Sequence, residues 1–307
     1  LFGSNGEDFD CADPIGPQEQ LVPTNRLDDL VETHRRPALI RIRQSARQYA
    51  IYINNLNEVA EGLPLGIPVI ITTDPGHSLS MESGMSGGRG QPTIPGEQNI
   101  SGSTTLSNLP DTWGFGAIND QELSRQAGDL IREEFMAMGF RWQLGPMADS
   151  ATEPRWGRTS GTMAENPLQA AIHTRARVAG FQNYGCGEER CLTNGIAATM
   201  KHFPGAGPNQ NGMDSHTYVG RFNVFPGDNF AQHLMPFQAA VDVGVASVMA
   251  CYSVFKREIN GVLYPLPEDP YQVPAGFSPA LITDILKGQL GFTGMVTGDW
   301  GTSGDPY

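Results

Sequence analysis

The sequence predicts an α/β fold in which parallel strands alternate with helices, and three observations lead to that prediction. Short, almost continuously apolar segments recur along the chain, as in strands that helices cover on both faces of a sheet. The segments between them have the apolar spacing of amphipathic helices, and about six such alternations can be counted. Polar residues gather directly after the apolar segments, where a (β/α)8 TIM barrel carries its functional groups.

Each apolar segment gives one expected element. The expected strands are 38–42, 68–73, 141–146, 196–200, 246–252 and 294–297. The expected helices are 48–61, 120–138, 166–184, 229–243 and 281–290. We expect the whole chain, 1–307, to form one TIM-barrel-like domain that is incomplete at its C-terminal end, because six strands fall short of eight. Residues 1–30 are polar and irregular, and no element is expected there.

The main alternative is a doubly wound open sheet. No glycine-rich fingerprint follows any expected strand, which disfavours a dinucleotide site, and we expect no cofactor. Three long loops, at 79–111, 206–225 and 253–274, separate the elements. Loops of this length in a compact domain usually carry function or are mobile.

Composition and cysteines limit the class of protein. The formal net charge of -13 disfavours a nucleic acid duplex or an anionic membrane as a partner. No apolar run approaches the roughly 18 residues of a membrane span. Cys186 and Cys191 are close enough for a small disulfide, which suits a secreted or periplasmic enzyme, although the N-terminus has no signal-peptide pattern. No metal site is expected, Cys251 is expected to be a buried inert thiol, and Cys11 has no evident partner.

Four motifs on strand-end loops resemble one known family. They are PRWGR (154–158), KHFPG (201–205), VMACY (248–252) and GDWG (298–301). In this order they resemble the N-terminal barrel domain of glycoside hydrolase family 3, over about 68–300. The resemblance implies exo-acting removal of a terminal non-reducing β-linked sugar with retention of configuration. Many members of that family are β-glucosidases or β-xylosidases.

The resemblance assigns a role to each matched position. Asp299 matches the carboxylate nucleophile, which would form a covalent glycosyl-enzyme. Asp74 matches the acid that holds the outermost sugar hydroxyls. The three basic side chains expected to clamp the sugar, with positive charge that favours an ionised nucleophile, are Arg158, Lys201 and His202. Asp74 and Asp299 could instead be capping residues, and the Lys201 and His202 pair could be a structural ion pair.

Two aromatic residues complete the matched set. Tyr252 matches a tyrosine beside the nucleophile, where its hydroxyl could tune the carboxylate. Trp300 matches an aromatic platform for a sugar ring, and core packing is an equal alternative for it.

The four motifs do not assign the residue that acts as the general acid/base. In the N-acetylhexosaminidase branch an Asp-x-His pair follows KHFPGHG, and the corresponding candidates here are Asp214 and His216. Ala206 breaks that pattern and the pair lies further along, so a longer pocket-lining loop is the other interpretation. In the family a second, α/β-sandwich domain usually packs on the barrel and supplies a glutamate acid/base. We expect that domain, which is not in this chain, to be the partner of the barrel.

Four functions therefore remain at this point. The first is a β-glucosidase-type exo-glycosidase acting on a β-glycoside or oligosaccharide. The others are a β-N-acetylhexosaminidase that uses Asp214 and His216, a β-xylosidase, and a non-catalytic carbohydrate-binding fragment.

Overall fold

The computed structural model describes about two thirds of the chain. The described residues are 38–39, 46–74, 77, 106–107, 109–184, 192–227, 229–255, 258–259, 262–263 and 273–299. Several sequence-based expectations lie outside these ranges: the irregular segment 1–30, most of the loop 79–111, Cys11, Cys186, Cys191 and Trp300.

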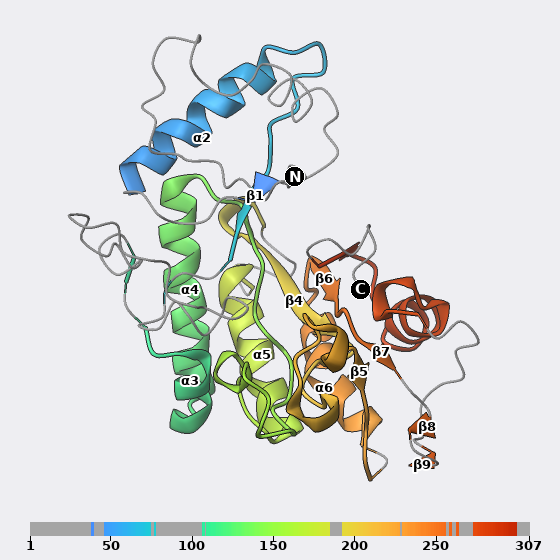
Figure 1. Ribbon diagram of the computed structural model, residues 1–307. Helices are drawn as coiled ribbons and strands as arrows, with labels where there is room; N and C mark the ends of the chain where they lie inside the picture. Colours follow the sequence, from blue (N-terminus) through green and yellow to red (C-terminus); the bar gives the residue numbers. More distant parts are fainter. Residues whose placement is uncertain are drawn as a thin grey trace, which may run out of the picture.

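Six parallel strands form one sheet whose spatial order follows the sequence (Figure 1). They are β1 (Ala38–Leu39), β2 (Ile71–Thr73), β3 (Trp142–Gln143), β4 (Ala197–Phe203), β6 (Ser247–Ala250) and β10 (Met295–Thr297). Two small pairs lie outside this sheet, β5 (Phe222–Asn223) parallel to β7 (Val254–Phe255) and β8 (Glu258–Ile259) antiparallel to β9 (Val262–Leu263). Sequential parallel strands with helical crossovers confirm the predicted α/β, TIM-barrel-like class.

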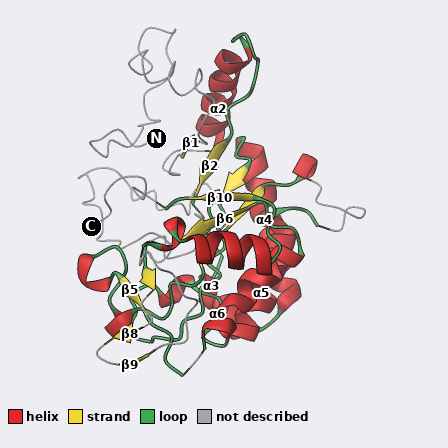
Figure 2. Cartoon of the chain, turned by 90° about the vertical axis from the view of Figure 1, so that its right-hand side faces the viewer, coloured by secondary structure: helices red, strands yellow, loops and turns green. Residues whose placement is uncertain are grey.

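The helices lie beside the sheet. They are α2 (Ala46–Glu61), α3 (Thr112–Ile118), α4 (Gln121–Met138), α5 (Pro167–Phe181), α6 (Phe230–Asp242) and the π-helix Ala280–Gln289. Helices α4, α5 and α6 lie side by side, and α5 packs against both of its neighbours (Figure 1). The turned view places α5 and α6 on one side of β6 and β10, and α2 at the far end beside β1 and β2 (Figure 2).

Local sequence signals explain where α4 begins and ends and where α5 begins. The Asp120 carboxylate accepts hydrogen bonds from the backbone N–H groups of Glu122 and Leu123, which caps the first turn of α4. Gly139 ends that helix at φ 93°, a left-handed conformation that glycine adopts without steric cost. Asn166 caps α5 in the same way, and Pro167 occupies its first turn.

Several observed elements differ from the expectations, among them the small β5–β7 and β8–β9 pairs in segments expected to be loops. Strand β4 continues to Phe203, beyond the expected end at residue 200, so Lys201 and His202 belong to the strand rather than to the loop after it. Helix α3 was not expected, because its seven residues include two glycines. The segment Ala280–Gln289 has π-helical rather than α-helical hydrogen bonding.

The interior combines an aromatic core with one polar layer. Phe203 meets Phe237 edge-on at 5.3 Å between ring centroids, which fixes β4 against α6. On the sheet itself Nε1 of Trp142 donates to Oγ1 of Thr199, which is 2.5 Å from Oγ of Ser247. This polar layer joins β3, β4 and β6, in the way that alternate inward side chains form layers inside a barrel.

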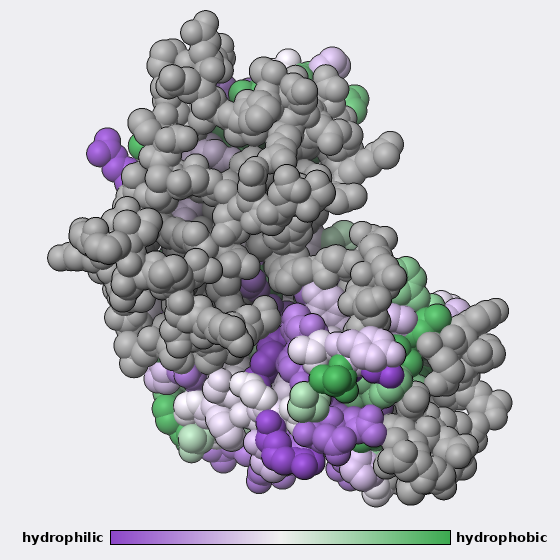
Figure 3. All heavy atoms as spheres, viewed as in Figure 1, coloured by the Kyte–Doolittle hydropathy of each residue, from purple (hydrophilic) through white to green (hydrophobic). Residues whose placement is uncertain are grey.

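The described surface is mixed in polarity. Hydrophilic residues cover most of the described surface over the β5 and α6 region, with small hydrophobic areas between them (Figure 3). No described helix has the combination of length and apolar character that would let it cross a bilayer.

The contact between α4 and α5 gives a stability prediction. A Cβ added at Gly180 would overlap the carbonyl oxygen of Arg125 and lie 2.8 Å from the backbone nitrogen of Asp129. Neither backbone atom can move without separating the helices. We therefore expect Gly180→Ala to lower the free energy of unfolding by about 1–3 kcal/mol, measured by urea unfolding.

Gly157→Ala is the matched control, because a Cβ there would have no heavy atom within 4 Å. Equal stability of the two variants would show that the α4–α5 contact is not as close as described.

Candidate active site

The polar side chains at the carboxyl ends of β2 and β4 form a buried ion pair. Asp74 directly follows β2, and Lys201 lies near the end of β4. Nζ of Lys201 is 2.9 Å from Oδ1 of Asp74, and the two side chains are only 7% and 13% exposed. The ends of parallel strands open at one edge of the sheet, which is why residues 127 positions apart meet here.

His202 lies between two carboxylates. Its Nε2 is 3.7 Å from Oδ2 of Asp299, which follows β10, and its Nδ1 is 2.9 Å from Oδ2 of Asp149. All three side chains are buried. Asp149 also accepts from the backbone N–H groups of His202 and Ala206, so it ties the end of β4 to the segment that follows β3.

Burial, nearby charges and hydrogen bonds together determine whether His202 and Asp149 are charged. Burial lowers the pKa of His202, the charge of Asp149 raises it, and the charge of Arg158 lowers it further, so the net direction is downward. Burial alone would raise the pKa of Asp149, but its interactions with His202 and with two backbone N–H groups outweigh burial and lower that pKa. The group at neutral pH is therefore an ionised Asp149 beside a neutral imidazole. This differs from the expectation that His202 adds positive charge next to Asp299.

Arg158 is a buried cation whose charge acts on His202. The residue is 9% exposed, and Nη2 lies 3.9 Å from Sδ of Met147. Within the described residues its Nε has no hydrogen-bond partner. Arg158 lies in the segment between β3 and α5, directly before the short turn Thr159–Gly161, and an Arg with an unused donor can bind a hydroxyl of a ligand.

A second acid–histidine pair lies on the loop after β4. Nδ1 of His216 is 2.5 Å from Oδ1 of Asp214, and the other carboxylate oxygen accepts from Nε1 of Trp156 at 2.7 Å. The ring of His216 meets the ring of Tyr252 edge-on, with centroids 4.7 Å apart. Burial would raise the pKa of Asp214, but the hydrogen bonds from His216 and Trp156 lower it well below its usual range. The loop thus carries an ionised carboxylate that orients an imidazole next to Tyr252.

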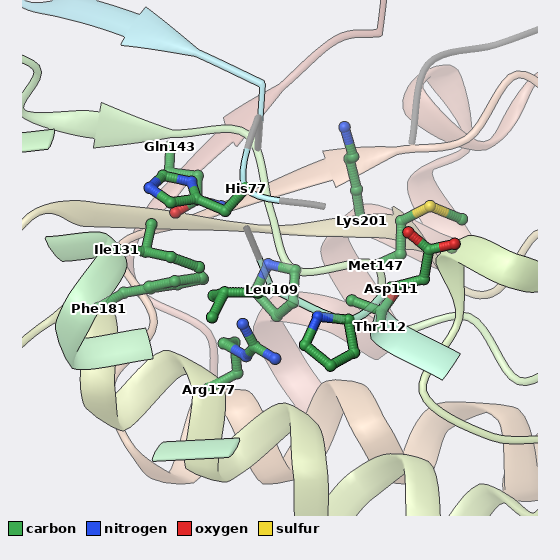
Figure 4. Close-up of a pocket in the computed structure, with 13 residues that line it drawn as sticks. His77, Leu109, Asp111, Thr112, Ile131, Gln143, Met147, Arg177, Phe181 and Lys201 are labelled. Carbon is green, nitrogen blue, oxygen red and sulfur yellow. The ribbon is translucent and has the colours of Figure 1, made fainter. Parts of the chain in front are cut away.

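A cavity of about 70 Å³ has Lys201 in its lining (Figure 4). Gln143, His77 and Arg177 lie on one side of it, and Lys201 and Asp111 lie on the other (Figure 4). Burial lowers the pKa of Arg177 to about 10 and that of His77 to about 4, so the first stays charged and the second neutral. Within the described residues Nε and Nη2 of Arg177 have no hydrogen-bond partner.

The structure places most of the sequence-predicted residues in two groups. Asp74, Lys201, His202 and Asp299 meet at the strand ends, with Arg158 acting electrostatically on His202. Asp214, His216 and Tyr252 form the second group. Trp300 lies outside the described residues.

Sequence reasoning missed Asp149 and Trp156. Asp149 follows β3 in the mostly apolar segment GPMADS, and an isolated acid in such a setting is a signal for a buried, paired carboxylate. Trp156 was visible inside PRWGR, but nothing local indicated that its indole N–H would bind Asp214.

The prediction for Cys251 is confirmed. It is a free, buried thiol, and burial raises its pKa to about 12, so it stays protonated. Among the residues that the structure describes, no cluster of His, Cys, Asp and Glu could hold a metal ion.

Comparison with known proteins gives a consistent set of relatives. Residues 90–305 match the model of the glycosyl hydrolase family 3 N terminal domain. Beta-glucosidase C of Emericella nidulans is 36% identical over 263 residues, which is 86% of this chain and 38% of that protein. The periplasmic beta-glucosidase/beta-xylosidase of Dickeya chrysanthemi is 36% identical over 80% of this chain and 34% of its own length. This chain therefore spans little more than a third of these two relatives.

One solved structure shows the same fold at low sequence identity. The glycoside hydrolase family 3 beta-N-acetylglucosaminidase of Paenibacillus sp. superposes with a TM-score of 0.67 at 23% identity, over 90% of this chain and 45% of that one. At this identity the similarity establishes the fold alone.

The buried His233 of α6 gives a prediction for how stability depends on pH. His233 is 1% exposed, its Nε2 lies 3.2 Å from Oγ1 of Thr152, and burial lowers its pKa from 6.5 to about 4. The unfolded chain binds a proton near pH 6.5 and the folded chain only near pH 4, so stability falls as pH decreases between these values. The fall is up to about 1.4 kcal/mol per pH unit.

His233→Gln removes this proton uptake. We expect the difference in free energy of unfolding between the wild type and this variant to shrink by about 2 kcal/mol from pH 7 to pH 5, measured by urea unfolding. A difference that does not change with pH would contradict the assignment of a neutral His233.

Proposed function

Because the chain belongs to glycoside hydrolase family 3, we propose that it provides the nucleophile and the sugar-binding residues of a retaining exo-β-glycosidase of the β-glucosidase type. The observation that supports this most directly is the position of Asp299, buried at the end of β10 and 3.7 Å from His202. A carboxylate with this setting can attack an anomeric carbon and form a glycosyl-enzyme. Water then releases the sugar with its original configuration.

The ion pair of Asp74 and Lys201 is the proposed site for the outer sugar hydroxyls. Together the two side chains present acceptors and donors in a fixed arrangement, since each holds the other in place. Arg158 supplies a further donor, and neutral His202 supplies an acceptor at Nε2. Tyr252 and Trp300 are proposed as the residues that flank the nucleophile and the sugar ring.

The relatives guide the choice of sugar. Both relatives that are 36% identical are named as β-glucosidases, and one of them is also named as a β-xylosidase and as periplasmic. We therefore favour β-glucosides, then β-xylosides, and a secreted or periplasmic location. The proposed partner of this chain is the remainder of a longer enzyme, packed against the strand ends.

A β-N-acetylhexosaminidase is the second candidate function. The observation in its favour is the Asp214–His216 pair beside Tyr252, because an imidazole held by a carboxylate can transfer protons near neutral pH. A beta-hexosaminidase of Stenotrophomonas maltophilia is 33% identical over 64% of this chain. Against it stands Ala206, whose position is a histidine in the hexosaminidase pattern. Parallel assays with aryl β-glucoside, β-xyloside and N-acetyl-β-glucosaminide decide among the sugars.

The nucleophile assignment predicts the behaviour of Asp299→Asn. An amide has nearly the shape of the carboxylate but is a poor nucleophile. In the full-length protein we expect kcat on an activated aryl β-glucoside to fall roughly 1,000-fold or more, about 4 kcal/mol, with an unchanged melting temperature. The exposed Asp284→Asn, on the π-helix before β10, is the control and should keep wild-type kcat. Near wild-type turnover in Asp299→Asn would remove Asp299 from this role.

The acid/base assignment predicts the behaviour of His216→Ala. If a carboxylate elsewhere in the full-length enzyme protonates the leaving group, the loss in kcat/KM should be within about fivefold and equal for activated and unactivated aglycones, as for a pocket-lining residue. We expect this outcome, since Ala206 breaks the hexosaminidase pattern. A loss that is much larger for poor leaving groups, with azide speeding the release of the glycosyl-enzyme formed from the activated substrate, would instead identify His216 as the acid/base.

A further inference from the structure

We infer that Asp149 is a positioning residue that holds His202 in the tautomer with its proton on Nδ1, so that Nε2 faces Asp299 as an acceptor. This inference rests on the proposed function, because it concerns the imidazole beside the proposed nucleophile. Asp149 has no expected contact with the sugar, since its carboxylate is fully buried behind His202.

The hydrogen bonds of Asp149 determine which nitrogen carries the proton. Its two oxygens face three N–H or ring-nitrogen groups: the backbone N–H of Ala206 at 2.6 Å, the backbone N–H of His202 at 3.2 Å and Nδ1 of His202 at 2.9 Å. An ionised carboxylate only accepts hydrogen bonds. Nδ1 must therefore donate, and a neutral imidazole has no second proton for Nε2.

The unprotonated Nε2 has a consequence for the nucleophile. At 3.7 Å, Nε2 and Oδ2 of Asp299 are too far apart for a direct hydrogen bond. At this separation Nε2 can accept a hydrogen bond from a substrate hydroxyl without donating a proton to Asp299. With the opposite tautomer, the partial positive charge of Nε2–H would face Asp299 and stabilise the carboxylate before reaction, which weakens it as a nucleophile.

The first test uses the unmodified full-length protein. Nitrogen-15 NMR of labelled histidine distinguishes a ring nitrogen that carries a proton from one that does not, and His202→Gln assigns the signal. We expect a neutral His202 at pH 7 with its proton on Nδ1. A proton on Nε2 at pH 7, on a neutral or a charged ring, would overturn the inference, and this readout requires no catalytic activity.

The second test replaces the carboxylate by its amide. In Asp149→Asn the backbone N–H groups of His202 and Ala206 can only donate, so the amide oxygen takes the position of the carboxylate oxygen that accepts from them. The amide NH2 then faces Nδ1 and donates to it, which moves the imidazole proton to Nε2. We expect this shift in the NMR signal, with a loss in kcat/KM of about 100-fold on an aryl β-glucoside. The exposed Asp284→Asn is the control and should change neither.

A double variant separates positioning from general support of the fold. If Asp149 acts through His202, adding Asp149→Asn to His202→Ala should change kcat/KM by no more than about twofold. A further large loss in the double variant would show that Asp149 acts mainly on the fold and would overturn the inference. If the tautomer is as expected but no glycoside is hydrolysed, the positioning by Asp149 stands and the proposed function fails.

Discussion

Buried charge at the carboxyl edge of the sheet is the constraint on which the site depends. Asp74, Asp149 and Asp299 are all largely removed from water, and an ionised carboxylate in such a place needs a basic partner or N–H donors. Two adjacent residues of β4 provide such partners: Lys201 pairs with Asp74, and His202 donates from its backbone N–H and from Nδ1 to Asp149. The extension of β4 to Phe203 therefore matters chemically. Its pairing with β6 shifts register between Lys201 and Phe203, so regular alternation does not apply there, and the two neighbouring side chains reach different carboxylates.

Much of the fold was predictable from sequence because its signals are local. Apolar periodicity located the strands and the long helices, and Asp120 and Gly139 marked the ends of α4. Helix α3 was not predictable, because a short segment with two glycines forms a helix only through tertiary packing. The small β5–β7 and β8–β9 pairs likewise depend on contacts between loops, which no local pattern encodes.

The sequence predicted most of the residues that lie in the site, but not which of them carry a charge. Motifs named the residues at the strand ends, but the partner of His202 is Asp149, 53 positions away on another strand end. Whether His202 is charged depends on burial and on Arg158, which are properties of the fold rather than of the KHFPG motif. The same holds for Trp156, which helps to keep Asp214 ionised next to His216.

Trapping of the glycosyl-enzyme tests the proposed chemistry most directly. A 2-deoxy-2-fluoro-β-glucoside with a good leaving group forms the covalent intermediate but releases it slowly, because fluorine destabilises the oxocarbenium-like transition state. Mass spectrometry of the labelled full-length protein should find one fluoroglucosyl group on the peptide that contains Asp299. Label on a different carboxylate, or turnover without any covalent label, would contradict the assignment of Asp299 as the nucleophile.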